Sequence, residues 1–202
     1  VANILNVAPT DILVDKNHGI SLNIDGGNNA YLSATDAGNI VGGLSAITIE
    51  VEFSSSHVDG TDMMLFSYHS GGAGDEIEIG INNDGMGNTL YLEIAGELIG
   101  NIAGYDASQL LDGGNHQVSL TWDNTAGDWG LFVDGVLLAD GAGVAVGQTI
   151  ESGGQIVLGQ EQDSLGGGFD PAQNFDGTYY DVRIFNDVRT NQEILDNAFG
   201  EV

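Results

Sequence analysis

The chain has 202 residues, of which 42% are hydrophobic and 32 are glycine, a composition that suits one large all-β domain rich in turns. Thirty Asp and Glu residues face only three basic residues, Lys16, Arg183 and Arg189, so the formal net charge is −27. This charge argues against nucleic acid and anionic lipid as partners, and the lack of an apolar run near about 18 residues argues against membrane insertion.

The first residues are expected to precede the main domain. We interpret residues 1–14 as a linker or lead-in strand and residues 15–202 as a single domain. The stretch 6–11, Asn-Val-Ala-Pro-Thr-Asp, resembles the junction between tandem modules in large bacterial surface adhesins. An ordinary lead-in strand explains it equally well.

Apolar and polar residues then alternate along most of the chain, which is typical of half-buried strands. The alternating segments are 20–24, 47–53, 76–81, 90–94, 118–122, 129–133, 156–158 and 180–184. Between two of them, Asp134-Gly135 predicts a two-residue hairpin turn, and near the end Thr190 and Glu193 form a capping box that predicts one short helix. The pattern predicts an all-β fold, a two-sheet antiparallel β-sandwich of the jelly-roll kind with one short helix near the C-terminus.

The segment after residue 158 carries the most specific pattern. It is too rich in glycine to continue the strand, and it holds Glu161 and Asp163, then Asp170 and Gln173. Calcium takes about six to eight oxygen ligands from carboxylates, amides and backbone carbonyls, which this loop can supply. The alternative is a solvated acidic loop in a very acidic protein.

The run Leu-Gly-Gln-Glu-Gln-Asp at 158–163, followed by glycines at 166–168, resembles the calcium loop of the pentraxins, which share a concanavalin A-like sandwich with laminin G domains. Residues 66–68, 75–77 and 132–135 are similar to other segments of that family. The resemblance implies one or two calcium ions. It implies these metal ligands: Asp75, Glu161, the backbone carbonyl of Gln162, Asp163, Asp170 and Gln173.

The sequence also departs from the family pattern. It has no cysteine, so the disulfide between the sheets is missing. Gly74 replaces one Asp of the acidic turn, and Gly80 stands where choline-binding members have an aromatic residue. Glu97 aligns loosely with a ligand contact.

The predicted function is a calcium-dependent, lectin-like extracellular module that binds glycans or phosphorylated groups on a surface, within a longer chain of neighbouring modules. The alternative is a calcium-stiffened spacer of a long surface adhesin. Catalysis is not expected. Glu76 and Glu78 share a strand face as in glycoside hydrolases, but Ile81 takes the place of the last carboxylate, and the alternation predicts that the glutamates face solvent.

The aromatic residues suggest no definite site. Trp122 and Trp129 have the parity of core residues. Four tyrosines, Tyr31, Tyr105, Tyr179 and Tyr180, would stack on sugars if exposed, which sequence alone does not show.

Overall fold

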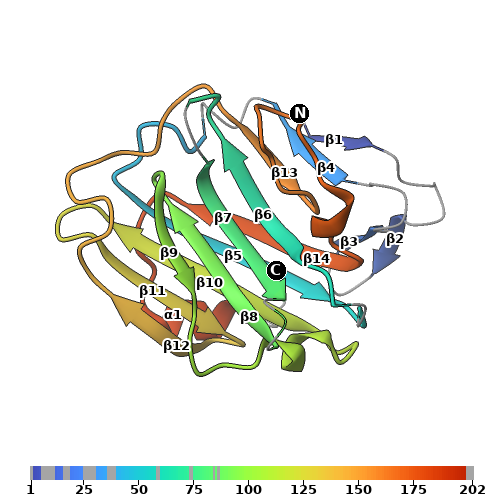
Figure 1. The fold of residues 1–202 in the computed structure, drawn as a ribbon. Helices are drawn as coiled ribbons and strands as arrows, with labels where there is room; N and C mark the ends of the chain where they lie inside the picture. Colours follow the sequence, from blue (N-terminus) through green and yellow to red (C-terminus); the bar gives the residue numbers. More distant parts are fainter. Residues whose placement is uncertain are drawn as a thin grey trace.

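The fold was analysed in a computed structural model, which describes residues 2–5, 12–15, 19–24, 31–35, 40–57, 60–72, 75–83, 85 and 87–198 (Figure 1). The strands are β1 (Ala2–Leu5), β2 (Ile12–Asp15), β3 (Gly19–Ile24), β4 (Tyr31–Ala34), β5 (Ala46–Ser54), β6 (Met63–His69), β7 (Asp75–Asn83), β8 (Asn88–Ile94), β9 (Glu97–Asn101), β10 (His116–Asp123), β11 (Asp128–Val133), β12 (Val136–Gly141), β13 (Gln155–Leu158) and β14 (Gly177–Phe185). The helical segments are the 3₁₀ turns η4 (Ala107–Leu111) and η5 (Pro171–Gln173) and the α-helix α1 (Asn191–Asn197).

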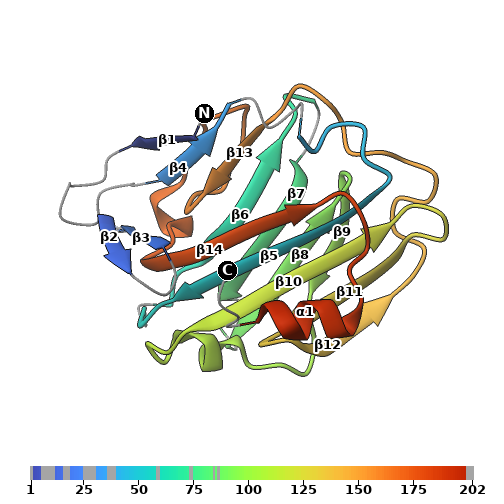
Figure 2. The ribbon, with the colours of Figure 1, turned by 180° about the vertical axis from the view of Figure 1, so that it is seen from behind.

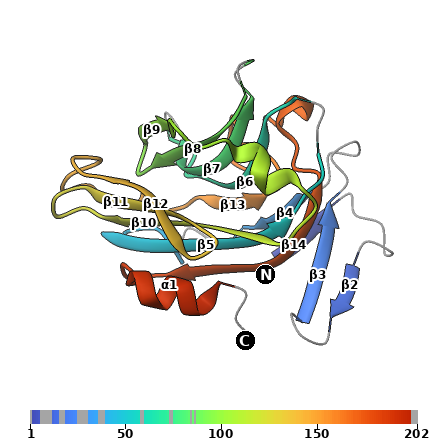
Figure 3. The ribbon, with the colours of Figure 1, turned by 90° about the horizontal axis from the view of Figure 1, so that it is seen from below.

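These strands form two antiparallel sheets that stack face to face (Figure 3). The first sheet has the order β1-β4-β13-β6-β7-β8-β9, and the second has the order β12-β11-β10-β5-β14-β3-β2. The predicted two-sheet antiparallel sandwich with one short helix is confirmed. Both described segments of the predicted lead-in, β1 and β2, pair within these sheets, and the boundary at residue 14 stays a prediction.

The core lies between the sheets and is built from the alternating apolar residues. In β5, Ile47, Ile49, Val51 and Phe53 are fully buried. Trp122 is also fully buried, and its indole N–H donates to the backbone carbonyl of Val144 at 3.0 Å. Trp129 lies opposite Trp122 in the β10–β11 register and packs against the same core, so the prediction that both tryptophans are core residues is confirmed.

Helix α1 covers the outer face of the second sheet (Figure 2). Its capping box is present as predicted, with Thr190 and Glu193 each accepting a backbone hydrogen bond from the other. The Asn197 amide donates to the Glu50 carboxylate at 3.2 Å, and Arg183 lies 3.8 Å from it. Burial raises the pKa of Glu50, although these partners oppose the shift. Within the described part of the chain, no helix has the length and apolar character of a membrane span.

The β11–β12 hairpin turns as predicted, and a histidine fastens it. Asp134 has φ 51° and Gly135 has φ 77°, the positive values that a two-residue turn requires. His116 Nδ1 hydrogen-bonds Asp134 at 2.9 Å, and its Nε2 hydrogen-bonds Asp112 at 3.2 Å. Burial lowers the pKa of His116, but the hydrogen bonds and charges of the two aspartates outweigh it, so the net pKa is raised.

This arrangement predicts that His116 stabilises the fold more at low pH. A histidine whose pKa is raised by folding contributes most below its ordinary pKa of about 6.5, and the contribution is lost as pH rises through the folded-state value. We expect His116→Gln to lower the free energy of unfolding more at about pH 5.5 than at about pH 8.5. Urea unfolding of both proteins at each pH measures this difference. An equal loss of unfolding free energy at the two pH values would contradict a stabilising attraction between protonated His116 and the two aspartates.

Candidate functional site

The segment that joins β13 to β14 folds back over the outer face of the first sheet. The core residues Phe66 and Tyr68 flank Ser67 in β6, so Ser67 faces outward. The side-chain amide of Gln162 donates to the Ser67 carbonyl at 3.2 Å and lies 3.1 Å from both the Ser67 hydroxyl and the Gln155 carbonyl. Its carbonyl oxygen accepts from the backbone N–H of Gly166 at 3.0 Å. Gln162 is fully buried, and it fastens the loop to the sheet.

A tight turn then reverses the loop. Ser164 and Gly167 exchange backbone hydrogen bonds of 3.2 and 2.8 Å. Gly168 has φ 80°, and a methyl group there would lie 2.6 Å from the β-carbon of Asp163. Only glycine permits this approach, which places Asp163 against the chain that leads to Asp170.

The second half of the loop is held by a ring contact and a cap. The Phe169 ring lies 4.5 Å from the Tyr31 ring of β4, measured between centroids. Asp170 caps η5, accepting from the backbone N–H of Ala172 at 2.9 Å, and its carbonyl accepts from the backbone N–H of Gln173 at 2.9 Å. Asp170 and Gln173 are thus held in one short turn.

The tip of the loop reaches the turn between β6 and β7. A methyl group at Gly71 would lie 3.7 Å from the Leu165 side chain, so the loop and the β6–β7 turn lie within contact distance of each other. Asp75 begins β7 beyond this turn, opposite His69 in the register, but its side chain lies outside the described part of the structure. The tip of the predicted metal loop therefore lies beside the turn that leads from β6 into β7.

The predicted ligands differ in exposure. Glu161 is buried with 6% of its surface exposed, whereas Asp163 and Asp170 are exposed and Gln173 is half-buried. Among the side chains that the structure describes, no three His, Asp or Glu residues converge closely enough to hold an ion. That these residues bind a metal ion stays a prediction.

One residue of the motif to which sequence reasoning gave no role is distinctive in the structure. Gln160 is fully buried, yet neither its amide nitrogen nor its oxygen has a hydrogen-bond partner among the described residues. An unpaired buried amide is costly, so this position at the root of the loop favours an added polar partner such as water or an ion. The donors of the loop are all oxygens of carboxylates, amides and backbone, which fit calcium.

Glu97 lies elsewhere in the first sheet. It begins β9, the edge strand three positions from β6, and its carboxylate accepts from the backbone N–H of Ala145 at 2.9 Å and from the Gln148 amide at 2.7 Å. These bonds anchor the segment between β12 and β13. Contact between Glu97 and a ligand stays a prediction.

The prediction that the glutamate side of β7 faces solvent is wrong. Glu76 and Glu78 are only 9% and 4% exposed. The backbone N–H of Glu151, from the segment before β13, donates to Glu76 at 3.0 Å and covers that end of the strand. Burial raises the pKa of Glu76, with the bond from Glu151 opposing it. Ile81, which takes the place of the last carboxylate in the hydrolase pattern, is a core residue.

Comparison with known proteins gives a consistent picture. Residues 25–195 match the family described as the concanavalin A-like lectin/glucanases superfamily, Laminin_G_3. Over 83 residues, or 41% of this chain, it is 41% identical to the "Sushi, von Willebrand factor type A, EGF and pentraxin domain-containing protein 1" of Rattus norvegicus. It is 40% identical over 92 residues, or 46% of this chain, to human pentraxin-4. These matches span 2% and 19% of the two relatives.

Solved structures share the fold at low identity. A native heptameric SAP-like pentraxin from Limulus polyphemus superposes with a TM-score of 0.66 at 19% identity, covering 78% of this chain and 71% of the other. Domain 4 of AbnA, a GH43 extracellular arabinanase from Geobacillus stearothermophilus solved with arabinotriose, superposes with a TM-score of 0.64 at 14% identity, covering 98% and 87%. The same sandwich therefore occurs both in pentraxins and within an enzyme.

Proposed function

The chain belongs to the concanavalin A-like lectin/glucanases superfamily, and from this premise we propose that it is a calcium-dependent ligand-binding module of lectin type. The observation that carries the proposal is the loop latched to the outer face of the first sheet by Gln162. The loop carries Glu161, Asp163, Asp170 and Gln173, and Leu165 at its tip lies within contact distance of the turn that leads into β7.

These residues would hold one or two calcium ions. Glu161 and Asp163 are the residues that two adjacent ions would share, with the Gln162 carbonyl and Asp75 at one and Asp170 and Gln173 at the other. A bound calcium ion would offer coordination positions to hydroxyl or phosphate oxygens of a ligand.

The proposed partner is a glycan or a phosphorylated group on a surface, and the proposed location is extracellular, with neighbouring modules in a longer chain. The relatives that support this are named as pentraxins or as pentraxin-domain proteins. The arabinotriose bound in the arabinanase domain supports the glycan class, since it shows a sugar held by this fold. We propose no catalytic role.

The function is tested on an array of glycans and phosphorylated ligands, probed once with calcium and once with a chelator. We expect retention of one ligand class in calcium and its loss in chelator. Reversal on adding calcium back controls for damage by the chelator.

Two other outcomes would contradict the proposal. Binding that is the same with and without calcium would remove the role of the ion. Calcium-dependent stability without retention of any ligand would instead support a stiffened spacer.

A further inference from the structure

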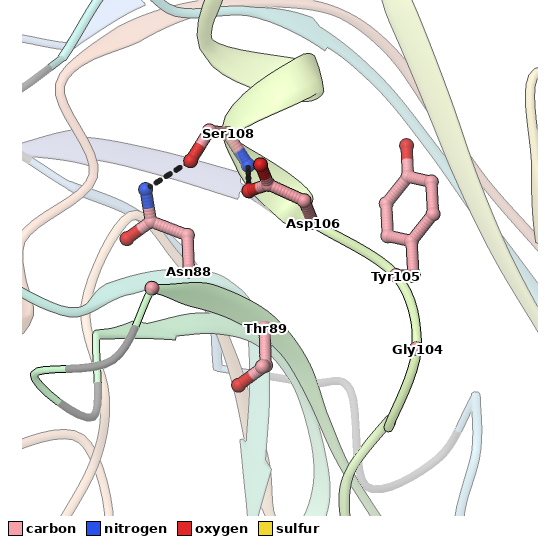
Figure 4. Close-up of a pocket in the computed structure, with 7 residues that line it drawn as sticks. Asn88, Thr89, Gly104, Tyr105, Asp106 and Ser108 are labelled. Carbon is pink, nitrogen blue, oxygen red and sulfur yellow. Dashed lines mark hydrogen bonds between the residues drawn. The ribbon is translucent and has the colours of Figure 1, made fainter.

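A separate hollow opens at the far end of the first sheet (Figure 4). Its volume is about 430 Å³, within the range of small-molecule sites. It lies where β8 begins, beside the segment between β9 and η4. The far end of β7 at Asn83 is eight residues from Asp75, or about 26 Å at the usual rise of a strand, so this hollow is distinct from the calcium loop.

The hollow has a braced wall. Asn88 Nδ2 donates to the Ser108 hydroxyl at 2.9 Å, and Asn88 Oδ1 accepts from the Asn83 amide at 2.9 Å. The backbone N–H of Ser108 donates to Asp106 at 3.0 Å, where Asp106 caps η4. The hairpin and the 3₁₀ turn are therefore tied together in advance of any ligand.

The hollow is lined by an aromatic ring and a carboxylate, which can stack on a sugar ring and accept hydrogen bonds from its hydroxyls. Figure 4 shows the Tyr105 ring across an open gap from Thr89, with Asp106 beside Ser108 at one side of that gap. Hydrogen bonds from the Ser108 side chain and backbone lower the pKa of Asp106, which keeps it an ionised acceptor. Burial raises the pKa of Tyr105, so its hydroxyl stays a donor.

Two glycines leave the entrance clear. Gly87 and Gly104 have φ values of 149° and 84°, and no described atom lies within 4 Å of the position that a Cβ would take at either residue. A ring can therefore approach the backbone on both sides. An anion would be repelled by the Asp106 carboxylate and by the negative field of the whole chain, and a purely apolar ligand would leave that carboxylate desolvated without a hydrogen bond from the ligand.

We propose that this hollow is a second binding site, for an uncharged saccharide, that works without calcium. One face of the sugar ring stacks on Tyr105, and its hydroxyls pair with Asp106. The site goes beyond the calcium-dependent function, and neither depends on the other.

The test is an amide NMR titration of the whole chain in chelator, using trisaccharides of glucose, galactose, mannose and arabinose, with tetramethylammonium as a cationic probe. We expect at least one trisaccharide to shift the amides around Tyr105 and Ser108 saturably. Tyr105→Ala and Asp106→Asn should each weaken binding about tenfold, since each removes a stacking or charged hydrogen-bonding contact. Asn remains a good N-cap, so Asp106→Asn keeps η4.

Tyr180→Ala is the matched control, because Tyr180 is a half-buried tyrosine outside this hollow and should leave the affinity unchanged. Glu161→Gln with Asp163→Asn should also leave it unchanged, which separates this site from the calcium loop. The proposal is overturned if no trisaccharide shifts these amides, if the shifts survive Tyr105→Ala, or if tetramethylammonium binds there more tightly than every sugar.

Discussion

Replacing Glu161 by Gln and Asp163 by Asn together is expected to abolish saturable calcium binding and all stabilisation by calcium. These are the two carboxylates that both proposed ions would share, and amides cannot balance the charge of two adjacent divalent cations. In the unaltered protein, calcium at about 100 times its dissociation constant should raise the free energy of unfolding by about 2.7 kcal/mol. Calorimetric titration of chelator-stripped protein and thermal unfolding with and without calcium measure the two effects.

The control for this pair must remove the same amount of charge elsewhere. Asp128→Asn with Asp140→Asn does so on β11 and β12 of the second sheet, where both residues are exposed. The control should bind calcium as the unaltered protein does. If both double variants show the same weak, non-saturable uptake as the parent, the loop is acidic surface, and the family likeness concerns the fold alone.

The sandwich could be predicted from sequence because a half-buried strand alternates apolar and polar residues with a period of two. Ile47 to Phe53 and Val118 to Trp122 alternate, and their apolar members form the core between the sheets, although the polar members of both strands are buried too. The Asp134-Gly135 turn and the Thr190 cap were predictable for a similar reason. Each depends on a backbone geometry that few residue types satisfy.

Burial on the outer faces could not be predicted in this way. Glu76 and Glu78 have the parity of solvent-facing residues, but Glu151, from a segment 75 residues away in sequence, bonds Glu76 and helps to bury it. Periodicity reports the side of a strand and says nothing of what covers that side. The candidate site shows the same limit, since the motif singled out the loop but not which side chain fastens it to the sheet.

Gln162→Ala is expected to release that loop. The sequence suggested a backbone role for Gln162, whereas in the structure its buried side chain bonds Ser67, Gln155 and Gly166. Alanine removes these bonds and leaves a backbone N–H and two carbonyl groups to find other partners, so we expect a loss of about 3 kcal/mol in the free energy of unfolding. Calcium affinity should fall about tenfold, because part of the binding energy must then order the loop.

Urea unfolding gives the stability, and hydrogen exchange at the Gly166 amide reports the latch itself. Gln192→Ala is the control, because Gln192 is exposed on α1 and its side-chain amide donates to Asp196 within the same helix. It should change stability by less than about 0.5 kcal/mol. Faster exchange at Gly166 with unchanged calcium affinity would show that the latch serves the fold alone. An ion held by this loop should restore part of the order that Gln162 provides, so saturating calcium should raise the stability of Gln162→Ala. If calcium affinity falls but saturating calcium does not stabilise the variant, the ion binds elsewhere.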